Sequence, residues 1–581
     1  MFCGGGLEPS GFSWTVFSQQ YAQWLLPYLA LLSQLPFGAQ RRTDNLMSVV
    51  LTLGSPTLAG YSLYITLLNA RWLNAHLFRG LNYPSPTVRQ SVVRALSSLQ
   101  QVPLRVHPGN SAQFEYLIVH PGNDEWWIML ATELDYSHTW SISSATSIVW
   151  VVIAYFLTVA DSLSMVANNF NSSGQGIGSV WLWLLPIVVG WLVLSPKCDY
   201  DRVCKAYHKA NKRLVVPGSQ DPPPHHTPPP ANLGLTISPS SEWASYYPRN
   251  VTSSDELRIP PIFNYARALS WSRAVYITSL HYRTAWEKSS YCAAVDGLHI
   301  PADVYSDVPQ DDRPTDRNQI VQYCTPNPHV NVPWARRVVI NMIVASIMSL
   351  QLQWGTTFGA ILAAWFTPTT VSSFPWKGRT STQYRHQGFG CRSLAYLIYG
   401  MLSTIVWMSL VLSSILGYCA HHPVVHPPDL ENDKGHNRTA SNGFAAPGSE
   451  CDVDSSSQEV GSSEAATLIT REPASESAGV PTHSPIARVA SDWLRWIGKS
   501  LAVVNAIGII TNSIFQLAGV YDNCYCDSSV YTWGSAAFAV IAPNNSDVDL
   551  ARGAWIGALA LGLTCSTLFV GTIYLIRDSL P

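Results

Sequence analysis

Residues 553–576, GAWIGALALGLTCSTLFVGTIYLI, form an apolar run without a single charged residue. A helix needs about 20 such residues to cross the hydrocarbon core of a bilayer, and this run meets that length. Comparable runs recur along the chain, separated by polar, Arg-rich or Pro-rich segments. The pattern predicts an all-α polytopic membrane protein.

Composition supports this class. Of the 581 residues, 47% are apolar and only 12% are charged, which is low for a soluble protein. The net charge of -2 gives no basic field for nucleic acid, so the expected partner is the lipid bilayer. The 11 cysteines include no CxxC pair, which argues against a zinc ribbon and against a disulfide-dense scaffold.

About eight transmembrane helices are expected. The first contains two prolines and has no basic flank, so we expect a retained helix rather than a cleaved signal peptide. The fourth can begin as early as Ile177, and the fifth is long enough to be tilted. The eight expected ranges are 21–37, 46–68, 142–163, 180–194, 338–366, 394–416, 501–520 and 553–576.

The spans fall into four pairs joined by three long connections. The pairs occupy residues 1–70, 142–195, 338–418 and 496–581. The first connection, 71–141, carries an expected amphipathic helix, and the second, 196–337, carries a Pro-rich linker. The third, 419–495, is rich in Ser, Glu and Pro, and we expect it to be disordered.

The amphipathic helix lies between Ser85 and Val102. Val88, Val92, Leu96 and Leu99 recur there at helical spacing. Two interpretations are open: packing onto the membrane face or the protein's own bundle, which we favour, and recruitment of a cytoplasmic protein partner.

Basic residues predict the orientation. The connections counted as 69–141, 196–337 and 417–500, with the end of the chain after the last span, hold 28 of the 35 Lys and Arg residues. Since basic residues near spans are retained in the cytoplasm, we expect both termini and these connections there. Asn171 and Asn544 begin sequons in short connections and are candidate glycosylation sites on the opposite side. The plasma membrane and an internal membrane both fit this pattern.

Polar residues within spans carry the most functional information, because they are costly in hydrocarbon. In the seventh span Asn505, Gly508, Asn512, Gln516 and Gly519 recur at spacings of three and four residues. We call them the first polar seam. They either line a solute pathway or join helices by hydrogen bonds, and we favour the second interpretation.

The fifth span carries a second polar seam, formed by Ser346, Ser349 and Gln353 with Thr356 or Thr357. In the second span, Gly54-Ser55-Pro56 removes a helical hydrogen bond. We expect a simple kink there, with a broken helix of the transporter type as the alternative.

Enzyme and metal motifs are weak. His421, His422 and His426 lie in a Pro-rich stretch, and Asp199-Tyr200-Asp201 has a DxD spacing that recurs by chance. We therefore expect no catalytic residue, no metal site and no cofactor.

Three cysteines are expected at the side opposite the long connections. Cys391 precedes the sixth span, and Cys524 and Cys526 follow the seventh. In an oxidising compartment, Cys391 is expected to form a disulfide with either Cys524 or Cys526.

Several segments carry a resemblance: LLSQLPFGAQRRTDNLMSVVLTLGSPTLAGYSL at the second span, LQWGTTFGAILAAWFTPT at the fifth, GCRSLAYLIYG at the sixth and GVYDNCYCDSSVYTWG after the seventh. Together they resemble uncharacterised multi-span integral membrane proteins of filamentous fungi. The resemblance covers most of the membrane part and implies no catalytic or binding residue.

Two function classes follow. A passive channel or transporter-like bundle predicts that the two seams face one cavity and that Asn512→Leu or Gln516→Leu abolishes flux. A receptor or scaffold predicts dry, packed seams and cytoplasmic connections that recruit partners. A membrane enzyme is the least supported class.

Overall fold

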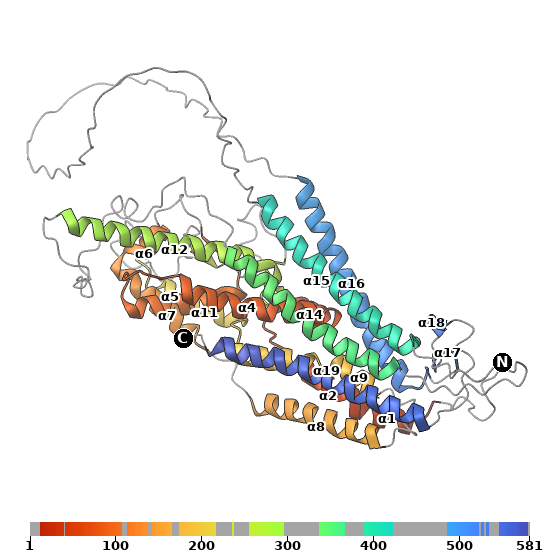
Figure 1. The fold of residues 1–581 in the computed structure, drawn as a ribbon. Helices are drawn as coiled ribbons and strands as arrows, with labels where there is room; N and C mark the ends of the chain where they lie inside the picture. Colours follow the sequence, from red (N-terminus) through yellow and green to blue (C-terminus); the bar gives the residue numbers. More distant parts are fainter. Residues whose placement is uncertain are drawn as a thin grey trace, which may run out of the picture.

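The computed structural model describes residues 12–39, 41–106, 113–136, 141–164, 174–215, 235–237, 255–295, 336–365, 388–421, 485–521, 524–527, 530–533 and 545–578. Almost all of these are helical (Figure 1). The helical architecture predicted from the apolar runs is therefore confirmed.

Six helical segments in these ranges are long and apolar enough to cross a membrane. They correspond to the third to eighth predicted spans. Five are single helices and one consists of α9 and α10; the elements are α8 (Ile142–Ser164), α9 (Gly174–Trp181) with α10 (Leu184–Leu194), α14 (Arg336–Trp365), α15 (Cys391–His421), α16 (Pro485–Leu517) and α19 (Asn545–Arg577).

The first predicted span consists of three short helical pieces. These are α1 (Trp14–Gln20), the π-helical turn η1 (Tyr21–Leu25) and α2 (Leu26–Leu32). The Tyr28 hydroxyl donates to the Gly178 carbonyl at 3.0 Å, and the Ser144 hydroxyl donates to Gln34 Oε1 at 2.5 Å. These bonds hold the pieces against α9 and the beginning of α8.

The second predicted span is not a straight helix with a kink. It consists of α3 (Arg42–Gly54) and α4 (Pro56–His76), whose axes differ by 108° at the break. The expected simple kink is therefore wrong, because a bend this large redirects the chain.

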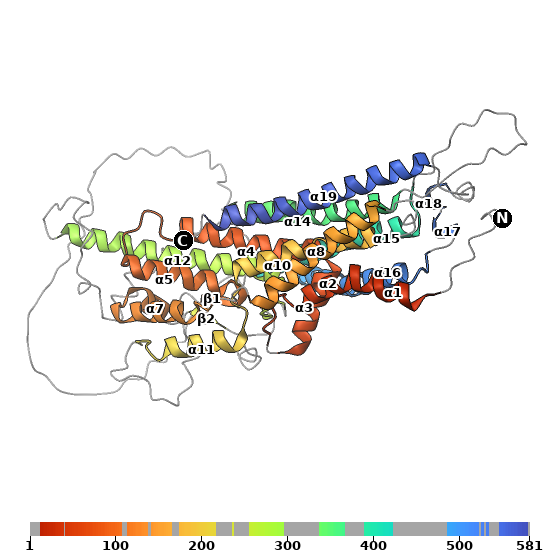
Figure 2. The ribbon, with the colours of Figure 1, turned by 90° about the horizontal axis from the view of Figure 1, so that it is seen from below.

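A second hydrophobic core lies at one end of the bundle, and we call the part built on it the module. It gathers elements from the first two long connections around the end of α4. The elements are α5 (Pro86–Ser98), η2 (Leu99–Gln101), β1 (Leu104–Val106), α6 (Gln113–Val119), η3 (Pro121–Asn123), α7 (Asp124–Glu133), α11 (Tyr200–Asn211), β2 (Leu235–Ile237) and the later part of α12 (Asn264–Val295). β1 and β2 pair antiparallel, with Leu104 opposite Ile237. Figure 2 shows these elements grouped beside one end of the bundle.

The predicted amphipathic helix is α5. Its apolar side chains Val88, Val92 and Leu96 are buried in the second core. Trp126 and Trp127 of α7 are fully buried in the same core. The apolar face of α5 thus packs onto the protein itself, as the favoured interpretation states.

α12 joins the two cores. Its first turns bury Ala266 and Leu269 in the core of the bundle, and later turns bury Trp271, Ala274 and Tyr282 in the core of the module. A short helix, η5 (Pro261–Phe263), precedes it. One continuous helix therefore mechanically couples the module to the bundle.

The segment 419–495 does not match its prediction throughout. Residues 422–484 lie outside the described residues, but α15 extends to His421 and α16 begins at Pro485. The last turns of the predicted disordered segment are helical because Ser491 and Arg495 are buried against neighbouring elements. The Pro-rich linker and Asn171 and Asn544 also lie outside the described residues.

The bundle has two distinct ends, which we call the module side and the disulfide side. The disulfide side carries α17 (Cys524–Asp527) and α18 (Val530–Trp533) (Figure 1). α1 lies near these helices, whereas α19 ends at the module side (Figure 1). The first described helix and the end of the last one therefore lie at opposite ends of the bundle.

Candidate functional site

The break between α3 and α4 follows from three consecutive residues. Pro56 has no N–H and disfavours the helical conformation at Ser55, which has φ -149° and ψ 86°. The Ser55 hydroxyl then caps the new helix by accepting from the Leu58 amide at 3.2 Å. Pro56 occupies the first turn, where a missing N–H costs nothing.

Gly54 lets the break lie against α16. A Cβ at this position would lie 2.1 Å from the Ala502 carbonyl oxygen, a distance that no side chain can accommodate. Only a glycine therefore allows the last turn of α3 to touch the backbone of α16.

Both helices of the α3–α4 pair, which we call the hairpin, contact the segment 258–264. Asp44 in the first turn of α3 lies 3.6 Å from the Arg258 guanidinium. On α4, the Ser62 hydroxyl donates to the Ile262 carbonyl at 2.8 Å, and Thr66 accepts from Asn264 at 2.6 Å. One segment therefore contacts both helices, whose axes differ by 108°.

A group of buried hydroxyl and amide side chains surrounds the break. We call Ser55, Thr57, Gln353, Thr357, Ser403 and Asn505 the polar cluster; all are buried. Ser403 is its hub, since its hydroxyl lies 3.3 Å from those of Ser55 and Thr57 and 3.4 Å from Gln353 Oε1. Gln353 in turn donates to Thr357 at 2.8 Å.

Two side chains satisfy the carbonyl groups that the break leaves without helical partners. Asn505 donates to the Gly54 carbonyl at 2.8 Å, and it also donates at 3.1 Å to the Tyr399 carbonyl inside α15, which is not one of the carbonyls at the break. The Tyr399 hydroxyl donates to the Leu53 carbonyl at 2.9 Å. Because an unpaired carbonyl is costly in a membrane interior, these bonds make the broken helix tolerable there.

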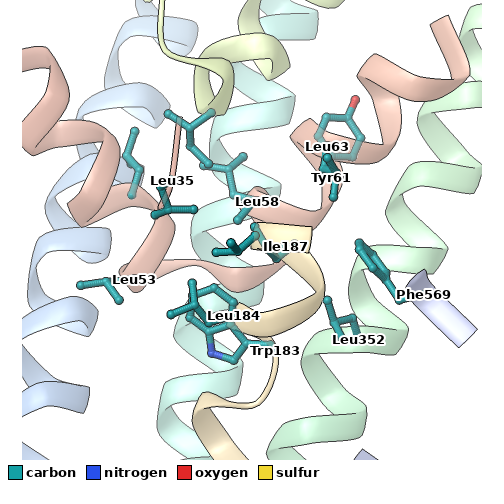
Figure 3. Close-up of a cluster of buried hydrophobic side chains, with 14 of the residues drawn as sticks. Leu35, Leu53, Leu58, Tyr61, Leu63, Trp183, Leu184, Ile187, Leu352 and Phe569 are labelled. Carbon is teal, nitrogen blue, oxygen red and sulfur yellow. The ribbon is translucent and has the colours of Figure 1, made fainter. Parts of the chain in front are cut away.

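The cluster lies midway along the bundle. Gln353, Ser403 and Asn505 fall in the middle third of α14, α15 and α16. Figure 3 shows Leu53 and Leu58 on either side of the break, with Leu184 and Ile187 of α10 close by. Side chains of the hydrophobic core thus lie beside the break.

The two predicted seams differ in how they meet the cluster. Asn505 and Gln353 reach it from α16 and α14, while Ser349 is buried and bonds to its own helix at the Ser346 carbonyl. Ser346 is half-buried and also bonds within α14. The second seam therefore contributes mainly Gln353 and Thr357.

The rest of the first seam lies nearer the disulfide side. Gln516 accepts from the Tyr396 hydroxyl at 2.6 Å, and Asn512 accepts from the Tyr521 hydroxyl at 2.9 Å. Gly508 is exposed, and no atom lies within 4 Å of where its Cβ would be. The five residues therefore do not all face the interior.

A disulfide joins two of the three predicted cysteines. Cys391, at the beginning of α15, bonds to Cys526 of α17. Beside it, the Tyr531 amide donates to the Phe389 carbonyl at 3.1 Å, and the Phe389 amide donates to the Thr532 hydroxyl at 2.8 Å. These contacts fasten the α17–α18 segment to the end of α15.

Several residues that bear on the site are not evident in the sequence. In the sixth span, Tyr396, Tyr399 and Ser403 recur at spacings of three and four residues, and this spacing was the signal available in the sequence. Asp255 lies outside the predicted spans, yet it is fully buried. Within the described ranges, no group of three or more His, Cys, Asp or Glu residues could hold a metal ion.

No protein family, curated protein or solved structure matches the chain. The resemblance to fungal membrane proteins therefore stays a prediction, and the function has to be argued from the geometry alone.

Proposed function

We propose that this chain is a multi-pass integral membrane protein that passes small, uncharged polar solutes through its bundle, and that the α3–α4 hairpin is the selective element. The observation that carries the proposal is the break at Gly54–Thr57, midway along the bundle and surrounded by the polar cluster.

Discontinuous helices have a particular use in membrane proteins. Their broken ends bring backbone amides and carbonyls to the middle of the bilayer, where an intact helix offers none. Polar side chains at that depth are costly and generally mark pathways or helix contacts. The hairpin combines both features, and the groups converge from α14, α15 and α16 onto one place.

The chemistry around the break favours an uncharged solute. The hydroxyl groups of Ser55, Thr57 and Ser403 can both donate and accept hydrogen bonds. The side-chain amides of Gln353 and Asn505 each add an NH2 group that donates and a carbonyl oxygen that accepts. Lys499 and Arg495 of α16 are both nearer its module-side end than Asn505 is. A small molecule with hydroxyl or amide groups can replace the internal hydrogen bonds one for one, whereas an ion would leave its charge without a partner.

The conformation described is a closed one. Each cluster side chain has a protein partner for at least one polar group, and all six side chains are buried. Opening then requires a movement of the hairpin relative to α15 and α16. Because the cluster bonds are between neutral groups, each stabilises the closed form only modestly.

The proposed topology places the module side in the cytoplasm. α1 to α2 would cross the bilayer, the hairpin would enter and leave from the module side, and the six long segments would complete seven crossings. Arg41 and Arg42 then join the side that already holds 28 of the 35 basic residues, which strengthens the charge asymmetry. The disulfide would face an oxidising compartment.

Solute flux in vesicles tests the proposal. The full-length protein would be reconstituted into liposomes, and the entry of water, urea and glycerol would be followed by stopped-flow light scattering, with potassium formate as the charged comparison. We expect faster entry of at least one uncharged solute than in protein-free vesicles. Ser403→Leu should abolish this difference by filling the hub of the cluster.

Two further variants make the result specific. Thr57→Val keeps the side-chain volume, removes one hydroxyl and should slow entry without unfolding the protein. Ser413→Ala is the matched control, because Ser413 is also a buried serine of α15 but bonds to Ser491 at the module-side end. Flux equal to that of protein-free vesicles, or unchanged flux in a folded Ser403→Leu protein, would contradict the proposal.

A membrane scaffold is the second candidate, and the module favours it. A separate core joined to the bundle by α12 is a large folded body for a protein that only conducts a solute. If scaffolding is the function, deleting residues 427–480 should abolish recruitment of partners in cells while liposome flux shows no protein-dependent component.

A further inference from the structure

Asp255 is the most deeply buried carboxylate at the junction between bundle and module. Its side chain is 0% exposed. Three cationic groups lie against it: Lys499 forms a close ion pair, the Arg495 guanidinium lies at 3.3 Å and that of Arg258 at 3.7 Å. The Tyr265 hydroxyl donates a further hydrogen bond at 2.7 Å.

This cluster joins four separate elements. Asp255 and Arg258 belong to the segment before η5, Tyr265 to α12, and Arg495 and Lys499 to α16. Asp44 brings in the first turn of α3 through Arg258. We call these six residues the clasp.

The segment that carries Asp255 is held rigidly to α12. Arg267, 2% exposed, donates to the carbonyls of Arg258, Ile259 and Pro260 and to Asn264 Oδ1. It also donates to the Gln100 carbonyl of the module at 3.3 Å. A movement of the module is therefore transmitted to Asp255 through Arg267 and α12.

The clasp lies on the route between the module side and the polar cluster. Six residues of α16 separate Lys499 from Asn505, which is about 9 Å along a helix. Ten residues of α3 separate Asp44 from Gly54, about 15 Å. The clasp thus ties the first turn of α3 to α16 on the module side of Asn505, and the inner parts of the same two helices meet at Gly54.

We propose that the clasp is the module-side gate of the hairpin: when Asp255 leaves its cationic partners, α3 separates from α16 and the polar cluster becomes accessible from the module side. The inference rests on the proposed function of the hairpin. Such a cluster suits a two-state device, because a buried carboxylate is strongly disfavoured once its partners are removed.

Thiol labelling at Ser48 tests the gate without measuring transport. Ser48 lies one turn inside Asp44 on α3 and is 5% exposed. A Ser48→Cys protein in lipid nanodiscs would be treated with a membrane-impermeant maleimide, and labelling of the peptide that contains residue 48 would be followed by mass spectrometry. When the six residues of the clasp are unchanged, we expect the cysteine at position 48 to be labelled slowly.

Asp255→Asn should raise the labelling rate at position 48 by roughly tenfold or more, since opening free energies shift by several RT when a buried ion pair is broken. Lys499→Met, which removes the closest cation, should act in the same direction. Glu125→Gln is the matched control, because it breaks an ion pair with Arg213 on the module surface. It should leave the rate unchanged.

Cys565 reports whether the whole protein loosens. It is buried on α19 against α14, where a Cβ on Gly355 would lie 2.3 Å from its sulfur. Its labelling should stay slow in every variant. Unchanged labelling at position 48 in Asp255→Asn and Lys499→Met, or an equal rise at Cys565, would overturn the gate. If labelling at position 48 rises in the clasp variants but the protein carries no solute into liposomes, the proposed function is overturned and the gate is not.

Discussion

Asn505 shows how one side chain makes a broken helix stable in a membrane. Its amide nitrogen donates to carbonyl groups on two different helices, at Gly54 and Tyr399. An asparagine inside an apolar run is visible in the sequence, so its importance could be predicted. Its partners could not, because both are backbone carbonyls far away along the chain.

Asn505→Ala should therefore destabilise the protein. The Gly54 carbonyl at the break loses its donor, which costs about 1–3 kcal/mol for a buried group left unsatisfied. The free energy of unfolding in mixed micelles, followed by tryptophan fluorescence, measures the change. Ser346→Ala is the comparison, since among the described residues the Ser346 hydroxyl bonds to Met342 of its own helix alone. Equal losses in the two variants would show that the capping bonds contribute nothing.

Glu115 and His281 form a second residue-scale feature, in the core of the module. Glu115 Oε1 lies 3.9 Å from His281 Nε2, and both side chains are buried. Burial raises the pKa of Glu115 above its usual 4.5 and lowers the pKa of His281 below its usual 6.5. The folded module therefore favours the neutral form of each group.

The sign of the pH dependence follows from proton binding. With its pKa raised, the folded Glu115 carboxyl holds its proton above pH 4.5, where the unfolded one has lost it, so stability falls as pH rises through that window. Glu115→Gln should remove this loss. Its unfolding temperature should exceed that of the unmodified protein at pH 8 and match it below pH 4.5. Parallel curves for the two proteins at all pH values would exclude the effect.

Among the elements, the hairpin is where sequence and structure differ most. Gly54-Ser55-Pro56 predicts an interruption, and an interruption is present. The 108° change of direction is decided by contacts with Ala502, Ser403 and the segment 255–264, all distant in sequence. The straight spans could be predicted because apolar length alone determines them.

Gly54→Ala should destabilise the protein by about 1–3 kcal/mol, because its methyl group overlaps the Ala502 carbonyl. Gly508→Ala is a matched control on α16, where nothing lies within 4 Å. There the substitution should be neutral or stabilise by up to about 1 kcal/mol through helix propensity. Comparable unfolding free energies for both variants would mean that α3 does not approach α16 this closely.

The disulfide is a second element-scale feature. The sequence left Cys524 and Cys526 as alternative partners of Cys391, and the structure pairs Cys526. Cys526→Ser should abolish the linked peptide pair seen by mass spectrometry after digestion without reductant. Cys524→Ser should leave it intact. The opposite pattern would assign the bond to Cys524.

At the scale of the whole molecule, the sequence predicted a membrane bundle but not which segments build the module. Its core draws on residues 73–134, 203–214 and 271–285. Two membrane segments, α8 and α9–α10, separate the first of these ranges from the other two along the chain. α5 could be recognised by its amphipathic spacing. Its packing against α7 and α12, and the position of Asp255 between module and bundle, depend on tertiary contacts.

In the proposed topology, the hairpin enters and leaves the membrane on the module side. Arg42→Cys and Arg71→Cys each place a cysteine near one end of the hairpin, and Trp14→Cys places one on α1. Each variant would be treated with a membrane-impermeant maleimide in sealed vesicles of known orientation. Mass spectrometry would then report labelling at each position. We predict that positions 42 and 71 are labelled from the same side and position 14 from the opposite side. Labelling of positions 42 and 71 from opposite sides would make α3–α4 a crossing span and contradict the account.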